Sequence, residues 1–256
     1  MTSQNPDNSI DKSLDNFVFI DAIGNISYNY IAFEKWCQKN HLSVEKTLQE
    51  FKLINKPYDK LRSGELINAT NKAKSVFGPE IMLDEMYFCE FYKIPRFGKT
   101  RVGQILLHAK QTQNEKYIRV ICDQFKDKLI KLAKDFDCLC FVPPSTPRSI
   151  QFMDVLNETI NSTKPRIIAT KQFGDLAIQQ KTLKNRNDRI ENARETILIK
   201  SDKTYGSCLI IDDAIGSGST LNEIARKLKN LKIITGKVVG VGIVGNLDGF
   251  EVINEI

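Results

Sequence analysis

The stretch that decides the fold covers residues 208–220 and reads CLIIDDAIGSGST. Its first four residues are apolar, as is typical of a strand buried in a parallel sheet. Two aspartates follow at once, and buried carboxylates are costly unless a ligand or a partner group meets them. A loop of small residues comes next and leads into the helical pattern of TLNEIARKLKNL. The sequence therefore predicts a strand, a ligand-binding turn and a helix in succession.

The second half of the chain alternates between strand and helix patterns. Short apolar runs predict strands at residues 138–142, 166–170, 195–200, 208–212 and 237–245. Apolar residues at helical spacing predict helices at residues 115–136, 149–161 and 220–231. Residues 99–110 are expected to form a strand that leads into the first core helix. This alternation favours the α/β class, with a central parallel sheet flanked by helices.

The first half has a less regular pattern. Residues 30–53 predict two helices broken near residues 41–43, which either pack as a pair or form a DNA-reading helix-turn-helix. Residues 86–97 are rich in aromatic side chains, namely Tyr87, Phe88, Phe91, Tyr92 and Phe97. Such rings either stack on a nucleobase or form a hydrophobic clasp between the two halves of the chain.

Composition narrows the class of protein. The 256 residues are 41% hydrophobic and 27% charged, as in a soluble globular protein, and no apolar run is long enough to span a membrane. The polar first residues carry no signal core, so we expect a cytoplasmic protein. Six cysteines without a CxxC pair predict reduced, buried thiols rather than a zinc site. The net charge of +6 is compatible with nucleic acid or with a polyanionic small molecule.

The turn after the predicted strand has the chemistry of a sugar-phosphate site. Asp212 and Asp213 can accept hydrogen bonds from a diol or hold a hydrated divalent metal. Backbone amides of a glycine-rich loop at a helix start can cradle a phosphate. A Walker loop requires a lysine that this loop lacks. The two features together predict a ribose 5-phosphate site, and the alternative is a turn with an aspartate cap.

Residues 208–220 resemble the signature of the type I phosphoribosyltransferases, an apolar strand, two acids, and a small-residue loop ending in Gly-x-Thr or Gly-x-Ser. The resemblance implies their fold and the substrate phosphoribosyl pyrophosphate (PRPP). It implies that Asp212 and Asp213 are catalytic, facing the ribose hydroxyls and Mg²⁺, which accompanies the pyrophosphate. It also implies that residues 216–220 wrap the 5-phosphate, and that the substrate is bound by Ala214, Ile215, Gly216, Ser217, Gly218, Ser219 and Thr220.

Two further segments lie where that family has substrate loops. FVPPSTPRS (141–149) occupies the place of the pyrophosphate loop, with Pro144, Ser145, Thr146 and Arg148 as binding residues; the alternative is a surface turn stiffened by proline. The basic segment 179–192 occupies the place of the mobile loop that closes over the substrate. There the resemblance implies catalytic roles for Lys181 and Arg186, and a solvated basic loop is the alternative.

Within the superfamily the chain is most similar to the competence protein F type, over about residues 100–250. That likeness rests on Gln180, Leu183, Arg186, Arg189 and Asn192. Two departures stand out. The chain lacks the cysteine zinc finger of many such proteins, and Gly216 stands where hypoxanthine-type enzymes place an acidic base.

These patterns predict a mobile tail at residues 1–16, an N-terminal appendage at 17–96 and a phosphoribosyltransferase domain at 97–256. The implied reaction transfers the phosphoribosyl group to a base-type acceptor and releases pyrophosphate, with the acceptor pocket built by the appendage. The alternative is a non-catalytic, PRPP-sensing regulator or a protein associated with DNA uptake. A homodimer is the expected assembly.

Overall fold

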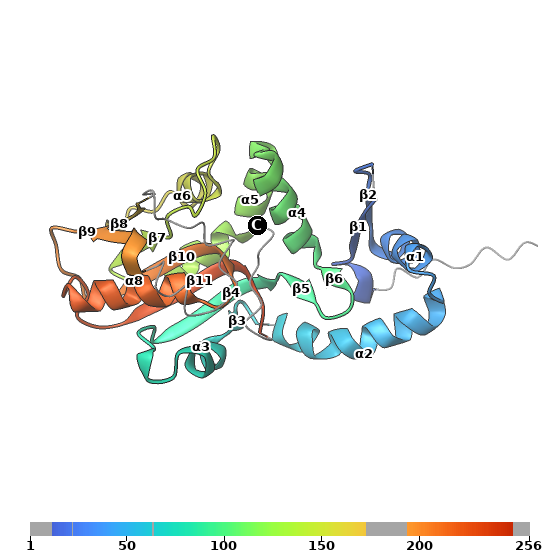
Figure 1. The fold of residues 1–256 in the computed structure, drawn as a ribbon, viewed down its shortest axis with the longest axis horizontal. Coiled ribbons are helices and arrows are strands. Elements are labelled where there is room, and N and C mark those ends of the chain that lie inside the picture. The colour runs from blue at the N-terminus through green and yellow to red at the C-terminus, as the bar shows by residue number, and fades with distance from the viewer. Residues whose placement is uncertain (1–11, 22, 63, 173–193, 248–256) are drawn as a thin grey trace, which may run out of the picture.

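The core of the structure is a mostly parallel sheet (Figure 1). The computed structural model describes residues 12–21, 23–62, 64–172 and 194–247. Within these residues seven strands pair in the order β3 (Ile67–Asn68), β4 (Glu85–Phe91), β11 (Val238–Gly245), β10 (Cys208–Ile215), β7 (Cys138–Phe141), β8 (Arg166–Lys171) and β9 (Ile197–Lys200). The five inner strands are parallel and the two edge strands antiparallel. The predicted α/β class is confirmed.

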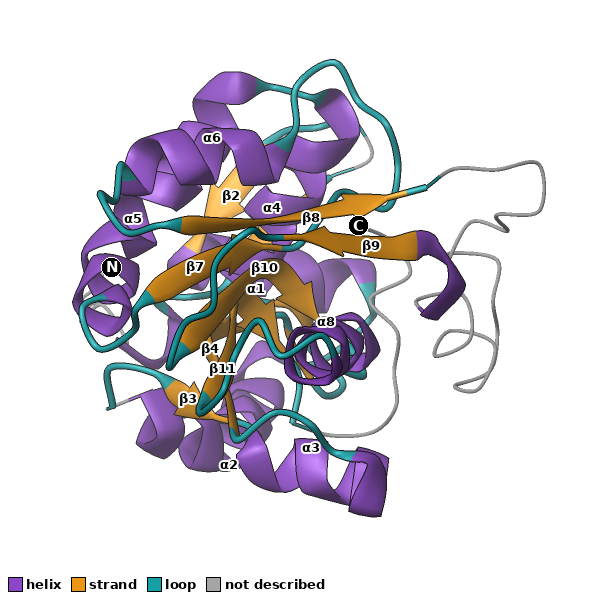
Figure 2. Ribbon diagram, turned by 90° about the vertical axis from the view of Figure 1, so that its left-hand side faces the viewer, coloured by secondary structure: helices purple, strands orange, loops and turns teal. Residues whose placement is uncertain are grey.

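Helices cover both faces of this sheet (Figure 2). Successive residues of a strand point to opposite faces. Leu209 and Ile211 therefore pack on the side of α4 (Arg101–Thr112), α5 (Glu115–Ala133) and α6 (Phe152–Ile160). Cys208 and Ile210 pack on the side of α3 (Thr70–Phe77) and α8 (Ser219–Asn230). Burial from both sides explains why β11 is apolar along its whole length.

The N-terminal appendage forms around an aromatic cluster. The described residues that precede Arg101 include two 3-10 turns (Lys12–Leu14 and Gly78–Glu80), the hairpin β1 (Val18–Ile20) and β2 (Ile26–Tyr28), and the hairpin β5 (Lys93–Ile94) and β6 (Gly98–Lys99). The predicted helix pair is confirmed as α1 (Asn29–Lys39) and α2 (Val44–Arg62). The rings of the cluster are those of Phe17, Phe33, Trp36, Phe51 and Phe97. Leu14 is fully buried in the same core, so residues 12–14 pack against the appendage.

The prediction of a strand within residues 99–110 is wrong beyond Lys99, the last residue of β6, because the helix α4 begins at Arg101. Thr100 caps the helix, and its hydroxyl accepts a hydrogen bond from the Gly103 amide at 3.1 Å. The same hydroxyl donates to the Phe91 carbonyl at 2.5 Å, which fixes the helix start at the end of β4. The buried residues Val102, Leu106 and Ala109 follow helical spacing. Their apolar side chains suggest a strand only if the helical spacing between them is ignored.

The aromatic stretch at residues 86–97 belongs to the core. Phe88 and Phe91 lie in β4, a sheet strand on the N-terminal side of residue 97, and both are fully buried. Tyr92 and Phe97 are also buried. These four rings therefore serve as the hydrophobic clasp, and because they are buried they cannot stack on a base.

The cysteines and the helices relate to two predictions about the chain as a whole. All six cysteines are buried and unpaired, as predicted for reduced thiols. None of the helices in the described residues combines the length and the apolar character needed to cross a bilayer.

Candidate functional site

The candidate site lies where the parallel strands end. Because β7, β10 and β11 run in the same direction, their carboxyl ends meet at one edge of the sheet. That edge receives the loop after β10, the segment after β7 and Asn246 after β11. The Val142 amide donates to the Ile211 carbonyl at 2.9 Å, which joins the β7 segment to the end of β10. The fold therefore brings two of the three predicted loops to one edge.

The loop after β10 has the backbone of a helix-start turn. Gly218 has φ +80°, a left-handed conformation that glycine adopts without strain, and α8 begins at the next residue. The hydroxyls of Ser217 and Ser219 are buried and lie 2.8 Å apart. A methyl group on Gly218 would lie 3.0 Å from Met86 Sδ. Met86 thus packs against one side of the turn, while the start of α8 presents backbone amides that suit an anion.

One side chain from outside the motif anchors this loop, and another fixes the helix that follows it. Lys72 on α3 donates from Nζ to the carbonyl oxygens of Gly216 at 2.8 Å and Asn246 at 2.5 Å. Asn222 in α8 accepts from the Met82 amide at 2.7 Å through Oδ1. Its Nδ2 donates to the Glu80 carbonyl at 3.0 Å. Sequence reasoning missed Lys72, because no local pattern indicates that residue 72 contacts residue 216.

The two aspartates lie inside β10, which continues to Ile215 rather than ending at residue 212. Alternation along the strand directs Asp213 to the face of Leu209 and Ile211, which α4 covers. There Asp213 Oδ2 lies 2.6 Å from Lys110 Nζ of α4. Asp212 has the opposite orientation, and its Oδ1 accepts a hydrogen bond from the Asp213 amide at 2.8 Å. The adjacent acids therefore have different surroundings.

The environment of Asp212 favours its neutral form. Burial is the main cause and repulsion from the Asp213 carboxylate adds to it, and together they raise the pKa of Asp212 to about 7. The positive charge of Lys110 and hydrogen bonds from the amides of Asp213 and Ala214 act in the opposite direction. A carboxyl that titrates near neutrality and lies close to the end of a parallel strand is a candidate ligand-binding group.

The acidic pair does not fit a magnesium ion held directly by the protein. Neighbouring residues of an extended strand project to opposite faces, so the two carboxylates cannot easily meet at one ion. One oxygen of Asp213 is also engaged by a lysine ammonium, whose charge repels a cation. The described residues contain no cluster of three or more His, Cys, Asp or Glu side chains that suits a metal.

The segment after β7 is held by glutamine side chains. Gln151 Nε2 donates to the carbonyls of Thr146 at 3.1 Å and Arg148 at 3.3 Å. Gln113 Oε1 accepts from the amide and the hydroxyl of Ser149 at 2.8 and 2.6 Å. The predicted binding residues of this segment, Pro144, Ser145, Thr146 and Arg148, are all half-buried. The segment is therefore a pinned turn beside the strand ends.

Two buried polar atoms near this edge lack a hydrogen-bond partner within the described ranges. They are Thr146 Oγ1, after β7, and Asn246 Oδ1, after β11. An unsatisfied buried polar atom is costly in a native protein. Both atoms belong to segments at the carboxyl edge of the sheet, where an ordered water or a polar ligand would satisfy them. The remaining predicted residues, Lys181 and Arg186, lie outside the described residues, as does the whole loop 179–192.

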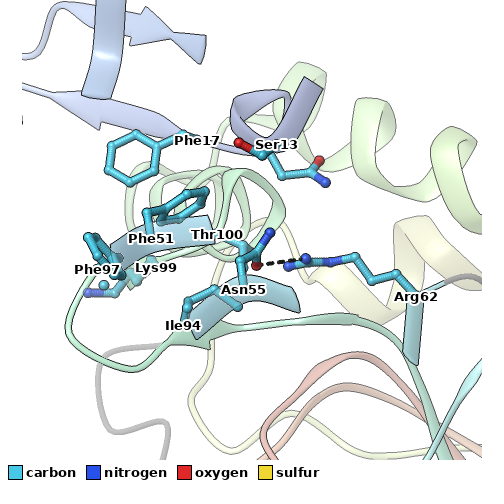
Figure 3. Close-up of a pocket in the computed structure, with 11 residues that line it drawn as sticks. Ser13, Phe17, Phe51, Asn55, Arg62, Ile94, Phe97, Lys99 and Thr100 are labelled. Atoms are coloured by element: carbon cyan, nitrogen blue, oxygen red, sulfur yellow. Dashed lines mark hydrogen bonds between the residues drawn. The ribbon is translucent and has the colours of Figure 1, made fainter. Parts of the chain in front are cut away.

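The appendage, which is predicted to build the acceptor pocket, contains a small cavity (Figure 3). It is lined by apolar rings, including Phe17, Phe51 and Phe97, and by polar groups, including Asn55 and Arg62. Arg62 donates to Asn55 Oδ1 at 3.2 Å and to Glu90 Oε1 at 2.7 Å. The cavity encloses about 10 Å³, which is room for about one water molecule. It is too small for a nucleobase.

The chain shows only weak similarity to known proteins. No protein-family model and no curated protein matches the sequence. Two solved structures of a hypoxanthine phosphoribosyltransferase from Staphylococcus aureus are similar to 50% of this chain, at 18% identity and TM-scores of 0.28 and 0.30. The match spans 61% and 62% of those chains. Likeness at this level does not bear on the activity of the present chain.

Proposed function

We propose that the chain binds PRPP and transfers its phosphoribosyl group to a base-type acceptor, as a protein similar to the type I phosphoribosyltransferases. The observation that carries this proposal is the turn at residues 212–220. In it, a half-buried carboxyl at a strand end is followed within six residues by a left-handed glycine that starts a helix. These two features match the two ends of a ribose 5-phosphate, with the carboxylate accepting hydroxyls and the helix start receiving the phosphate.

The reaction in this proposal is a substitution at C1 of the ribose. A nitrogen of the acceptor base forms the new bond to C1, and the bond from C1 to the pyrophosphate oxygen breaks. The electron pair of that bond leaves with pyrophosphate, and the acceptor nitrogen releases its proton to solvent or to a basic group. The protein contributes by holding the ribose phosphate still and by stabilising the departing charge. Mg²⁺ belongs in this scheme to the pyrophosphate of the substrate.

The pinned turn after β7 is suited to the departing group. Gln151 engages the carbonyl oxygens of Thr146 and Arg148, so these acceptors point to the glutamine side chain. The guanidinium of Arg148 supplies a positive charge on the same turn. A pyrophosphate seated there would lie next to the end of β10.

The activity is tested by pyrophosphate release. The purified chain is incubated with PRPP, Mg²⁺ and a panel of purine and pyrimidine bases, and pyrophosphate is measured with a coupled assay. We expect release with at least one base and no release with Asp212→Asn. Release that requires no base would indicate hydrolysis of PRPP. PRPP binding without turnover, together with PRPP-dependent binding to DNA, would replace the transferase with a PRPP-sensing regulator.

A further inference from the structure

The ion pair between Lys110 and Asp213 is unusual in its burial. The side chains of Lys110 and Asp213 are 9% and 15% exposed, and Nζ and Oδ2 lie 2.6 Å apart. Lysine and aspartate are rarely buried unless they are paired, because each loses hydration. The two residues are 103 positions apart in the sequence. The fold thus places one cation directly against one of the two acids of the candidate site.

The placement follows from the two elements that carry the pair. Lys110 lies in the last turn of α4, where the helix dipole favours a positive charge. The start of that helix is fixed by Thr100, and Gly103 lets α4 approach the end of β4, since a methyl group there would lie 2.2 Å from the Tyr92 carbonyl oxygen. Lys110 is therefore delivered by a tightly docked helix rather than by a flexible loop.

The two acids are accordingly inequivalent. Asp213 is directed to the α4 face and engaged by the ammonium group. Asp212 is directed the other way, toward the face on which α8 packs, and α8 begins at the glycine-serine turn. Of the two carboxylates, Asp212 is the one that shares its face with the proposed phosphate cradle.

We infer that Lys110 determines which of the two aspartates contacts the ligand. It holds Asp213 away from ligand and leaves Asp212 as the carboxylate that accepts the ribose hydroxyls. Its ammonium group also keeps a divalent metal away from Asp213, so that the ribose phosphate group binds without a metal held by the protein. This inference rests on the proposed function, and it assigns Lys110 as a positioning residue rather than a catalytic one.

The first test measures metal binding alone. Mn²⁺, which is detected by its paramagnetic resonance, is titrated into the parent chain, Lys110→Met and the double variant Lys110→Met/Asp213→Asn. We expect Lys110→Met to bind one Mn²⁺ ion more than the parent and the double variant to lose that ion. The double variant removes both charges, so it guards against a fold weakened by an unpaired buried aspartate. Mn²⁺ binding by the parent that Asp213→Asn abolishes would overturn the inference.

The second test measures ligand affinity. Calorimetry with ribose 5-phosphate is run on the parent with and without EDTA, and we expect the dissociation constant to change by less than about twofold, because no metal joins the contact. Asp212→Asn is expected to weaken binding at least about tenfold, as for loss of a charge-assisted hydrogen bond. The double variant Lys110→Met/Asp213→Asn is expected to weaken it less than Asp212→Asn.

The outcomes separate the two proposals. Ribose 5-phosphate binding that EDTA abolishes would leave the proposed function standing and overturn the role of Lys110. A larger loss in the double variant than in Asp212→Asn would do the same. Failure of the parent to bind ribose 5-phosphate or PRPP under either condition would overturn the proposed function, and the inference with it.

Discussion

At the scale of single residues, neighbours in the sequence have different physical roles. Asp212 and Asp213 are adjacent, yet burial raises the pKa of the first to about 7 while the second is paired with a lysine, because a strand directs successive side chains to opposite faces. Residues distant in the sequence are coupled instead. Lys72 joins the carbonyls of Gly216 and Asn246, and through them the ends of β10 and β11.

The raised pKa of Asp212 predicts a dependence of stability on pH. Between the ordinary value of 3.8 and about 7, the folded chain keeps the Asp212 proton while the unfolded chain has lost it. The free energy of unfolding therefore falls as the pH rises through this window and levels off above it. Asp212→Asn cannot titrate, so the difference between parent and variant isolates the effect. Urea unfolding from pH 4 to 8 measures it, and a difference that is flat or rises with pH would contradict the assignment.

Removal of the Lys72 ammonium is expected to loosen the phosphate turn. Lys72→Met leaves the Gly216 and Asn246 carbonyls without this donor, which should lower the free energy of unfolding by about 1–3 kcal/mol. Lys74→Met, at an exposed position of the same helix, is the matched control and should have little effect. Equal urea midpoints for the two variants would show that Lys72 does not anchor the loop.

At the scale of elements, most of the sheet around residues 208–220 can be predicted from the sequence. The strand, turn and helix of residues 208–230 follow directly from the apolar run, the glycines and the helical spacing, and the neighbouring strands were recognised in the same way. The helix α4 was missed, because its identity depends on the Thr100 cap and on close contact with Tyr92. The roles of Lys110 and Lys72 were missed for a related reason. Both arise from contacts across more than a hundred residues, which no local pattern encodes.

The docking of α4 on β4 predicts a strict requirement at Gly103. A methyl group there meets the Tyr92 carbonyl oxygen at 2.2 Å, a backbone atom that cannot move aside cheaply. Gly103→Ala should therefore lower the free energy of unfolding by about 1–3 kcal/mol, as other overpacked sites do. Gly64→Ala, where the nearest atom lies at 3.5 Å, is the control and should be nearly neutral. Comparable thermal midpoints for the two variants would contradict the close packing of α4.

At the scale of the whole molecule, the appendage and the sheet share a core. Phe33 and Phe51 of the appendage belong to the same buried cluster as Cys140 and Ile210 of the sheet. Phe88, Phe91 and Phe97 fill this shared interior, and Tyr92 is buried on the opposite face of the sheet. The cavity lined by Phe17, Phe51 and Phe97 is too small for a nucleobase, so aromatic content alone does not locate an acceptor pocket.

A shared core predicts cooperative unfolding. Trp36 is the single tryptophan of the chain and lies in the aromatic cluster of the appendage, so its fluorescence reports on that part. Far-ultraviolet circular dichroism reports on the helices and strands of the whole chain. The two signals should give coincident urea transitions, as expected for one cooperative unit. Fluorescence loss at clearly lower urea would show that the appendage unfolds separately.

The central claim is that residues 212–220 bind the ribose 5-phosphate group, and calorimetric titration of PRPP into the parent and Gly218→Val tests it most directly. Gly218 has φ +80° and a Cβ there would lie 3.0 Å from Met86 Sδ, so valine must distort the turn. Circular dichroism and the melting temperature establish that the variant is folded. The account predicts saturable binding by the parent and none by the folded variant. Equal binding by both chains, or none by the parent, would contradict it.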